Sequence, residues 1–263
     1  MRHLLPLLLG LSLLASSTVR ADSSHLDRVL AAGELRVCVW PDYYGNSYRN
    51  PHIQEMTGVD ADMARAFAKD LGVTLRFVDS SFALLVNDVT QDRCDVAMFG
   101  VGITPSRAGK LRFTRSYLVS DMHAITTRSN RRIQAWPDFD KPGVVVAVLR
   151  GTLHEPVLRY KLKAATMMVV DSPRAREQEV ESGRADVFMT DLPYSRRMLD
   201  TVDWASVVSP TAPYHVTPYA YAVRPGDDAW FARLEQFVAA IKRDGRLLTS
   251  ARSHKLDTIV DLR

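Results

Sequence analysis

The stretch DRCDVAMFGVGITPSR (residues 92–107) carries the strongest single indication of fold in this chain. Its middle, DVAMFGV (95–101), is a short continuous apolar run bounded by charged and turn-forming residues, which predicts a buried strand. A strand that is apolar on both faces is typical of a parallel sheet covered by helices. Two residues after this run come Thr-Pro-Ser and Arg107, which belong either to a solvated turn that starts a helix or to a site that binds an anion.

Strand and helix patterns alternate on either side of this stretch. Further buried strands are predicted in ELRVCVW (34–40), LRFVD (75–79), VVVAVLRGT (144–152), TMMVVD (166–171) and ADVFMTD (185–191). Helices are predicted in DADMARAFAKDLG (60–72), FALLVNDVTQ (82–91), HEPVLRYKLK (154–163), PRAREQEVESG (173–183), LPYSRRMLD (192–200) and DAWFARLEQFVAAIKRDG (228–245). The alternation predicts an α/β fold with mostly parallel sheets flanked by helices.

The chain contains this arrangement twice, since DRCDVAMFG (92–100) and GRADVFMTD (183–191) share one pattern. Extended segments near 117–121 and 216–220 separate the two units. We therefore expect two lobes joined by two hinge strands, with a cleft at the carboxyl ends of the parallel strands. The expected first lobe consists of 22–116 and 221–263, and the expected second lobe of 122–215.

The N-terminus has the pattern of an export signal. MRHLLPLLLGLSLLASSTVRA (1–21) has a basic start, an apolar run too short to span a bilayer, and small residues near Ala21. We expect cleavage of this segment and a periplasmic protein; an uncleaved membrane anchor is the alternative. Its removal takes away two of the 34 basic residues, leaving 32 against 30 acidic ones. That balance, with the basic residues scattered, gives no support to nucleic-acid binding.

Few residues indicate catalysis or metal binding. The only two cysteines, Cys38 and Cys94, are either a disulfide, which an oxidising compartment permits, or two buried thiols. The seven histidines show no metal-ligand spacing, and no nucleophile elbow or phosphate-binding glycine loop is present. We therefore expect no catalytic residue, no metal and no cofactor.

An ordered series of motifs resembles the periplasmic solute-binding proteins that serve polar amino-acid ABC importers. The series covers essentially the whole mature chain and reads LDRVLAAGELRVCVWPDYYGNSY, GVDADMARAFAKDLGV, DRCDVAMFGVGITPSR, FTRSYL, VLRGT, GRADVFMTD, YAYAVRPGD and IKRDGRL. The resemblance implies two lobes that close on a small amino acid or carboxylate. It also implies a monomer whose partner is the membrane permease of an importer.

The resemblance assigns roles to individual residues. Arg107 would grip the ligand's α-carboxylate, for which a guanidinium offers a matching fork of donors. Asp191 would pair with the α-ammonium, although an Asp at this place is also a preferred helix N-cap. The turn of Gly151, Thr152 and the following Leu153 would hold the carboxylate from the second lobe.

Three further positions belong to the implied site. Tyr43 and Phe82 would sandwich the ligand's side chain; as lone aromatics they could equally be core residues. The carbonyl of Gly100 would accept a hydrogen bond from the ammonium. We interpret Asp60 instead as a residue that caps or starts its helix.

The chain also departs from the family pattern. Gly102 stands where the family usually has Thr or Ser, so one hydroxyl contact to the carboxylate is missing. Trp40 stands where members that prefer basic amino acids often have an acid, which argues against a cationic ligand, although Asp42 is close by.

Two other functions remain open. The opening residues LDRVLAAGELRV and DYYGNSYRN are also similar to periplasmic cyclohexadienyl dehydratases, which use the same fold. Those enzymes have an acid soon after the Gly-Thr turn, where this chain has His154, with Glu155 one place further on. A sensor or accessory binding role, without an importer, is the third possibility.

Overall fold

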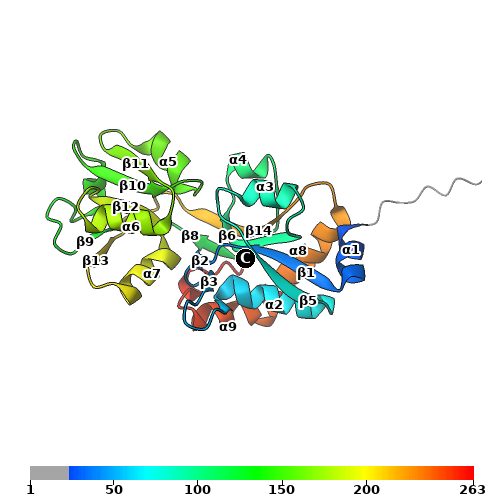
Figure 1. Cartoon of the computed structure of the whole chain (residues 1–263). Coiled ribbons are helices and arrows are strands. Elements are labelled where there is room, and N and C mark those ends of the chain that lie inside the picture. The colour runs from blue at the N-terminus through cyan, green and yellow to red at the C-terminus, as the bar shows by residue number, and fades with distance from the viewer. Residues whose placement is uncertain (1–23) are drawn as a thin grey trace, which may run out of the picture.

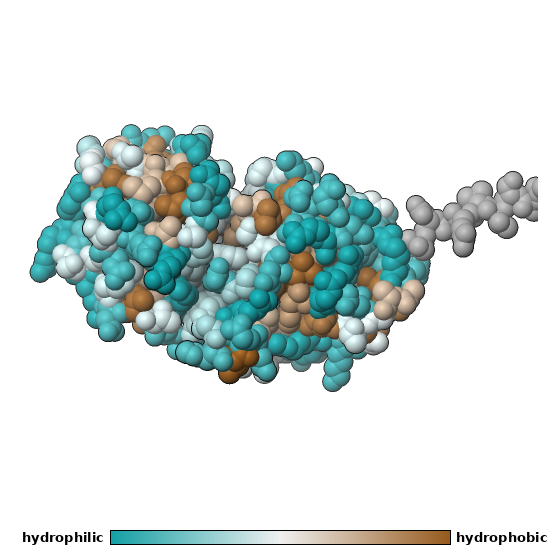
Figure 2. All heavy atoms as spheres, viewed as in Figure 1, coloured by the Kyte–Doolittle hydropathy of each residue, from teal (hydrophilic) through white to brown (hydrophobic). Residues whose placement is uncertain are grey.

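Two α/β units lie side by side in the computed structural model, joined through a narrow waist (Figure 1). The structure describes residues 24–263; the predicted signal peptide, 1–21, lies outside the described residues. On the face shown in Figure 2 the surface dips between the two units, and both carry mostly hydrophilic side chains with scattered apolar ones. No helix among residues 24–263 is both long and apolar enough to cross a membrane.

The first unit is built on a mixed sheet with strand order β5-β1-β6-β14-β7, and β8 also pairs with β14. Its strands are β1 (Glu34–Val39), β5 (Thr74–Asp79), β6 (Val96–Gly102), β7 (Arg112–Phe113), β8 (Leu118–Ser120) and β14 (Thr217–Val223). β1 pairs in parallel with β5 and β6, whereas β14 runs antiparallel to β6, β7 and β8. A small antiparallel sheet lies beside it and consists of β2 (Asp42–Tyr43), β3 (Ser47–Arg49) and β4 (Met56–Thr57).

The second unit repeats the plan with strand order β11-β10-β12-β9-β13. Its strands are β9 (Met122–Thr127), β10 (Val145–Leu149), β11 (Thr166–Val170), β12 (Val187–Asp191) and β13 (Ala205–Val208). β10 is parallel to β11 and β12, and β9 is antiparallel to β12 and β13. The predicted α/β fold with two mostly parallel sheets is confirmed, with antiparallel strands added on one side of each sheet.

Helices cover both faces of each sheet (Figure 1). The helices of the first unit are α1 (His25–Ala32), α2 (Val59–Leu71), α3 (Leu85–Thr90), α4 (Pro105–Ala108), α8 (Asp228–Asp244) and α9 (Arg246–Ser253), and a 3-10 turn spans Asp257–Ile259. Those of the second unit are α5 (His154–Lys161), α6 (Pro173–Glu181) and α7 (Leu192–Thr201), and a 3-10 turn spans Trp136–Asp140. The sequence indicated most of these helices but not α1, nor α9, which begins directly after Gly245 ends α8.

Side-chain alternation along the strands divides the core. In β12, Val187 and Met189 face α5, whereas Phe188 between them faces α6 and α7. In β1, Val37 and Val39 face α2 and α8 on one side of the sheet. One of the core clusters extends through both units, from the β1–β6 region to α6 and α7, so the two units are in direct contact.

Two connections join the units, and they are hydrogen-bonded to each other. β8 leads out of the first unit and β14 leads back, and Ser120 of β8 lies opposite Thr217 of β14. The pairing brings together the segments near 117–121 and 216–220 that the sequence indicated as extended. A paired two-stranded connection is the kind of element that can bend while the units stay intact.

Cys38 and Cys94 form a disulfide, with Cα atoms 5.5 Å apart. The bond ties β1 to the turn before β6, in the middle of the first sheet, so the disulfide reading of the two cysteines is correct. In the chain-entropy model, closing a loop of this length stabilises the fold by about 4 kcal/mol.

Candidate ligand-binding site

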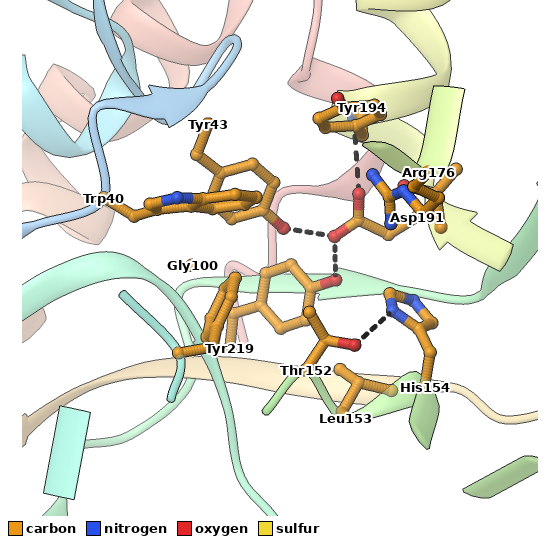
Figure 3. Close-up of a pocket in the computed structure, with 12 residues that line it drawn as sticks. Trp40, Tyr43, Gly100, Thr152, Leu153, His154, Arg176, Asp191, Tyr194 and Tyr219 are labelled. Atoms are coloured by element: carbon orange, nitrogen blue, oxygen red, sulfur yellow. Dashed lines mark hydrogen bonds between the residues drawn. The ribbon is translucent and has the colours of Figure 1, made fainter. Parts of the chain in front are cut away.

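A buried cavity lies between the two units, at the carboxyl ends of their parallel strands (Figure 3). The residues that line it are Trp40, Tyr43, Phe82, Gly100, Thr152, Leu153, His154, Arg176, Thr190, Asp191, Tyr194 and Tyr219. Figure 3 shows the aromatic residues of the first unit on one side and Asp191, Arg176 and His154 on the other. Parallel strands place their carboxyl ends at one edge of a sheet, so two facing sheets bring these residues together.

Six of the eight predicted ligand-binding residues line this cavity: Tyr43, Phe82, Gly100, Thr152, Leu153 and Asp191. The other two, Gly102 and Arg107, lie next to it. Their contacts to its wall are direct, since Arg107 stacks over Phe82 and Gly102 packs against Leu153. The sequence therefore pointed to the right place in the fold, while the role of each residue stays a prediction.

Arg107 connects the two units. It lies on α4, where Thr104 caps the helix by accepting from the Arg107 amide. Its guanidinium donates to the carbonyl of Gly102 in its own unit at 3.0 Å and to that of Gly151 in the other unit at 3.1 Å. The side chain is only 7% exposed, and burial lowers its pKa to about 10, so it stays charged at neutral pH.

Asp191 is the acid on the opposite unit. It ends β12, is 4% exposed and caps α7 by accepting from the Tyr194 amide at 3.2 Å. Its other oxygen accepts hydrogen bonds from the hydroxyls of Tyr43 and Tyr219, the latter at 2.6 Å. The N-cap interpretation is thus correct, and Asp191 also faces the first unit, while its pairing with an α-ammonium stays a prediction. Burial and the neighbouring Asp191 raise the pKa of both tyrosines well above the usual value.

The aromatic residues of the first unit are packed on one another. The rings of Tyr43 and Phe82 meet nearly edge to face with centroids 5.7 Å apart, and Trp40 contacts both. A sandwich of a ligand between Tyr43 and Phe82, as the resemblance implied, therefore requires these rings to separate. In the structure they form a continuous aromatic wall.

Glycines allow close packing beside the cavity, both within the first unit and between the two units. At Gly100, which has φ +61°, a Cβ would come within 2.7 Å of the Tyr43 ring and 2.6 Å of the Asn46 side chain. At Gly102 a Cβ would lie 3.0 Å from Leu153 of the other unit. The hydroxyl that the family usually places there would thus press on the second unit.

The turn after β10 already has internal partners for its donors. The amide of Gly151 donates to Glu155 at 3.1 Å, and both the amide and the hydroxyl of Thr152 donate to the carbonyl of Leu149. Glu155 also pairs with Arg159 on α5 and does not line the cavity. The predicted role of this turn in holding a carboxylate would require some of these bonds to open.

Four titratable residues of the wall were not assigned to the site from the sequence: His154, Arg176, Tyr194 and Tyr219. His154 is 5% exposed, and burial lowers its pKa to about 4, so it is neutral at pH 7. Arg176 is 1% exposed and stacks between the rings of Phe188 and Tyr194. A signal for His154 existed, since it follows the Gly-Thr turn; Arg176 lies in a helix so polar that no pattern marked it.

Behind Gly100 lies a second buried acid. Asp60 is fully buried, and neither of its carboxyl oxygens has a well-formed hydrogen bond among the described residues. Burial raises its pKa to about 7, although the nearby hydroxyls of Tyr117 and Tyr221 and the amide of Gly100 offset part of the rise. The sequence interpretation of Asp60 as a residue at the start of a helix is correct, but it missed this burial.

A separate group, His25, Asp92 and Asp95, is close enough together to hold a metal ion. Arg36 donates to Asp95 at 2.6 Å and lies 3.6 Å from Asp92, and Arg28 contacts His25. Two guanidinium groups in contact with the would-be ligands favour an ion-pair network over a cation site. We therefore place the candidate site in the cavity between the units.

In this structure the cavity is closed. Its volume of about 20 Å³ is close to what a single water molecule needs. The wall offers a cation, an acid, hydroxyls and aromatic faces, with Arg107 next to it, which suits the recognition of a small polar molecule. Among the residues that line it, one hydroxyl and one imidazole are in contact, since Nδ1 of His154 lies 3.3 Å from Oγ1 of Thr152 (Figure 3).

Comparison with known proteins places this geometry in a family. Residues 35–254 match the model of the bacterial extracellular solute-binding proteins, family 3. A cyclohexadienyl dehydratase from Pseudomonas aeruginosa is 34% identical over 257 residues, which cover 97% of this chain and 95% of the relative. The arginine-binding protein 1 of an Escherichia coli ABC transporter is 26% identical over 194 residues, 73% of this chain and 78% of the relative.

Solved structures of similar proteins have the same fold. The crystal structure of an ancestral amino acid-binding protein, described as a precursor of cyclohexadienyl dehydratase, superposes with a TM-score of 0.80 at 29% identity. The match covers 88% of this chain and 99% of that structure. This chain therefore belongs to family 3 of the bacterial extracellular solute-binding proteins.

Proposed function

We propose that this protein binds an amino acid or a similar small carboxylate between its two units and delivers it to an ABC importer. The observation that carries the proposal is the placing of opposite charges on opposite units at one buried cavity. Arg107 of the first unit reaches the carbonyl of Gly151 in the second. Asp191 of the second unit accepts from Tyr43 in the first. These two groups would hold the carboxylate and the ammonium of a zwitterion.

Binding would proceed by opening and closing at the waist. The closed cavity is too small for an amino acid, so the units must separate to admit one. We propose that the paired segments near 117–121 and 216–220 are the hinges, and that the lobes comprise 22–116 with 221–263, and 122–215. Closure would then bury the ligand among charged and aromatic groups, and a micromolar affinity corresponds to about −8 kcal/mol.

The family supports a proposal for the cellular location and the membrane partner of this protein. Relatives include proteins named as binding components of ABC transporters, and the family is described as extracellular. We propose a periplasmic monomer, released by cleavage after residue 21, that presents its closed form to a membrane permease.

A thermal-shift screen of the mature chain with amino acids and small carboxylates tests this function. A ligand at a hundred times its dissociation constant raises the free energy of unfolding by about 2.7 kcal/mol. We expect at least one ligand to do so. Arg107→Ala should lose the shift, because it removes the group proposed to hold the ligand's carboxylate. Arg243→Ala, at an exposed arginine on α8, is the matched control and should keep it. A full shift in Arg107→Ala would contradict the site.

A cyclohexadienyl dehydratase activity is the second candidate, because the Pseudomonas aeruginosa relative matches almost the whole chain. Such a reaction needs a general acid near the departing hydroxyl. His154 stands where those enzymes have an acid, but its pKa of about 4 leaves it unprotonated at pH 7, and Glu155 bonds within its own turn. Formation of phenylpyruvate absorbance from prephenate would establish the enzyme, and no product at micromolar protein would rule this activity out.

A further inference from the structure

Arg176 is the cation of the second unit, and it lines the cavity (Figure 3). Its guanidinium carbon lies 4.5 Å from the ring centroid of Phe188 and 4.4 Å from that of Tyr194. One nitrogen, Nη1, donates to the carbonyl of Met189 at 3.0 Å. Stacking between two rings and one bond to the backbone hold the planar group in a single orientation.

The rest of the guanidinium has no partner. Nε and Nη2 are buried and make no hydrogen bond within residues 24–263. The acids nearby are engaged elsewhere: Glu177 pairs with Arg197 and Tyr194, and Asp191 accepts from two tyrosines. Burying a cation whose donors lack partners costs free energy of folding. An anion bound in the cavity would reduce this cost by accepting hydrogen bonds from Arg176.

The charges around the cavity also favour an anionic group on the ligand. Arg107 and Arg176 are two cations, Asp191 is one anion, and His154 is neutral at pH 7. Asp60, behind Gly100, has a pKa of about 7 and is only partly ionised. The donors of the Gly151–Thr152 turn bond within the turn, so Arg176 is the stronger donor on that side. Asp42, the acid that would favour a cationic ligand, is exposed and does not line the cavity.

We propose that Arg176 binds a second acid group of the ligand, and that the ligand is therefore a small molecule with two carboxylates, such as an acidic amino acid. This rests on the proposed function, in which Arg107 and Asp191 hold the common amino-acid groups. Arg176 then acts as the specificity-determining residue. A ligand with a net charge of −1 would balance the cavity, whereas a basic amino acid would meet an uncompensated cation.

Isothermal titration of the mature chain with charge-only ligand pairs tests the assignment. Glutamate against glutamine, and aspartate against asparagine, keep size and change one charge. We expect the acidic member of at least one pair to bind at least tenfold more tightly, and arginine and lysine to bind more weakly than either. In Arg176→Met the acidic ligand should lose at least tenfold while its amide partner changes by less than threefold.

The melting temperature without ligand separates this role from a structural one. If Arg176 binds ligand, removing an unpaired buried charge in Arg176→Met should leave that temperature unchanged or raise it. A clear fall, together with equal losses of affinity for the acidic ligand and its amide partner, would assign Arg176 to the fold and overturn the inference. Arg176→Lys, which keeps the charge, should retain part of the preference for the acidic ligand and covers the case in which the methionine variant folds poorly.

The outcomes separate this inference from the proposed function. Tight binding of a neutral or basic amino acid, with no preference for its acidic counterpart, would overturn the role of Arg176 and leave the binding function standing. No binding of any amino acid or dicarboxylate would overturn both.

Discussion

The two walls of the cavity hold their charges in different ways. On the first unit, Arg107 donates to two carbonyls and bridges the gap, and Asp60 lies fully buried behind Gly100. On the second unit, Arg176 stacks between aromatic rings with two nitrogens unpartnered, while Asp191 has several partners. Each unit thus has near the cavity one ionisable group with clear hydrogen-bond partners and one that lacks them in whole or in part, and of the latter two only Arg176 lines the cavity.

This difference shows which buried groups near the site lower the stability of the fold. Burying a charged group without partners is unfavourable, and stable folds keep few such groups. Asp60 can relieve the cost by taking up a proton, because it is a carboxyl group with a raised pKa. An arginine cannot lose its proton at neutral pH, so the cost of burying Arg176 can be reduced only by a bound anion.

The largest expected effect concerns Asp60 and follows from its pKa of about 7. The folded pKa lies above the unfolded value of about 4, so the native state prefers the protonated form and stability falls as pH rises from about 4 to 7. Asp60→Asn removes this loss and should be more stable than the wild type at pH 8 by up to about 4 kcal/mol, with no difference near pH 4.

Urea unfolding at pH 4.5, 6 and 8 measures the slope. Asp203→Asn, at an exposed carboxylate with no ion pair in the described part of the chain, should show no such dependence. If Asp60→Asn and the wild type differ equally at every pH, Asp60 keeps its charge by some contact that we have not recognised, and the contrast between the walls is lost.

His154 on the second unit should show the opposite slope. Its folded pKa of about 4 lies below the ordinary value of 6.5, mainly because of burial, so the neutral form is favoured. Its contribution is present above pH 6.5 and is lost as pH falls toward 4. His154→Gln should therefore gain up to about 3 kcal/mol relative to the wild type between pH 7 and pH 4.

The same unfolding series measures this effect, and His52→Gln at an exposed histidine is the control. Measuring Asp60→Asn and His154→Gln together sharpens the comparison, since the two slopes oppose one another between pH 4 and 6.5. A His154→Gln curve parallel to that of the wild type would place the imidazole in contact with solvent.

The same groups show which features of the site could be predicted from the sequence. The position of Arg107 beside the site could be predicted because the local sequence signals are adjacent in the chain. They are a buried strand, a Thr that caps the helix and a Pro at the helix start. The alternation of strands and helices likewise predicted the sheets and most helices. Asp60 was recognised as a helix start, but its burial depends on Tyr117 and Tyr221, which arrive from distant strands.

Arg176 could not have been assigned from the sequence. It lies in PRAREQEVESG, where polar residues surround it and a solvated face is the natural reading. Its burial is decided by Phe188 of β12 and Tyr194 of α7, whose rings close over it only when the unit folds. The helix α9 was missed for a simpler reason, since a glycine that ends one helix gives no sign that another starts at once.

The smallest expected effect concerns the contact between the walls at Gly102. A Cβ there would lie 3.0 Å from Leu153 of the second unit and from Thr217 of β14, which is tighter than ordinary packing. Gly102→Ala should resist closure and weaken ligand binding by about 1 kcal/mol, roughly fivefold, because small overpacking has a cost of this order. Leu153→Ala removes the opposing methyl group, so the double variant should recover part of that loss. Titrations of the four proteins complete a double-mutant cycle, and additive losses would mean that Gly102 and Leu153 do not meet when ligand is bound.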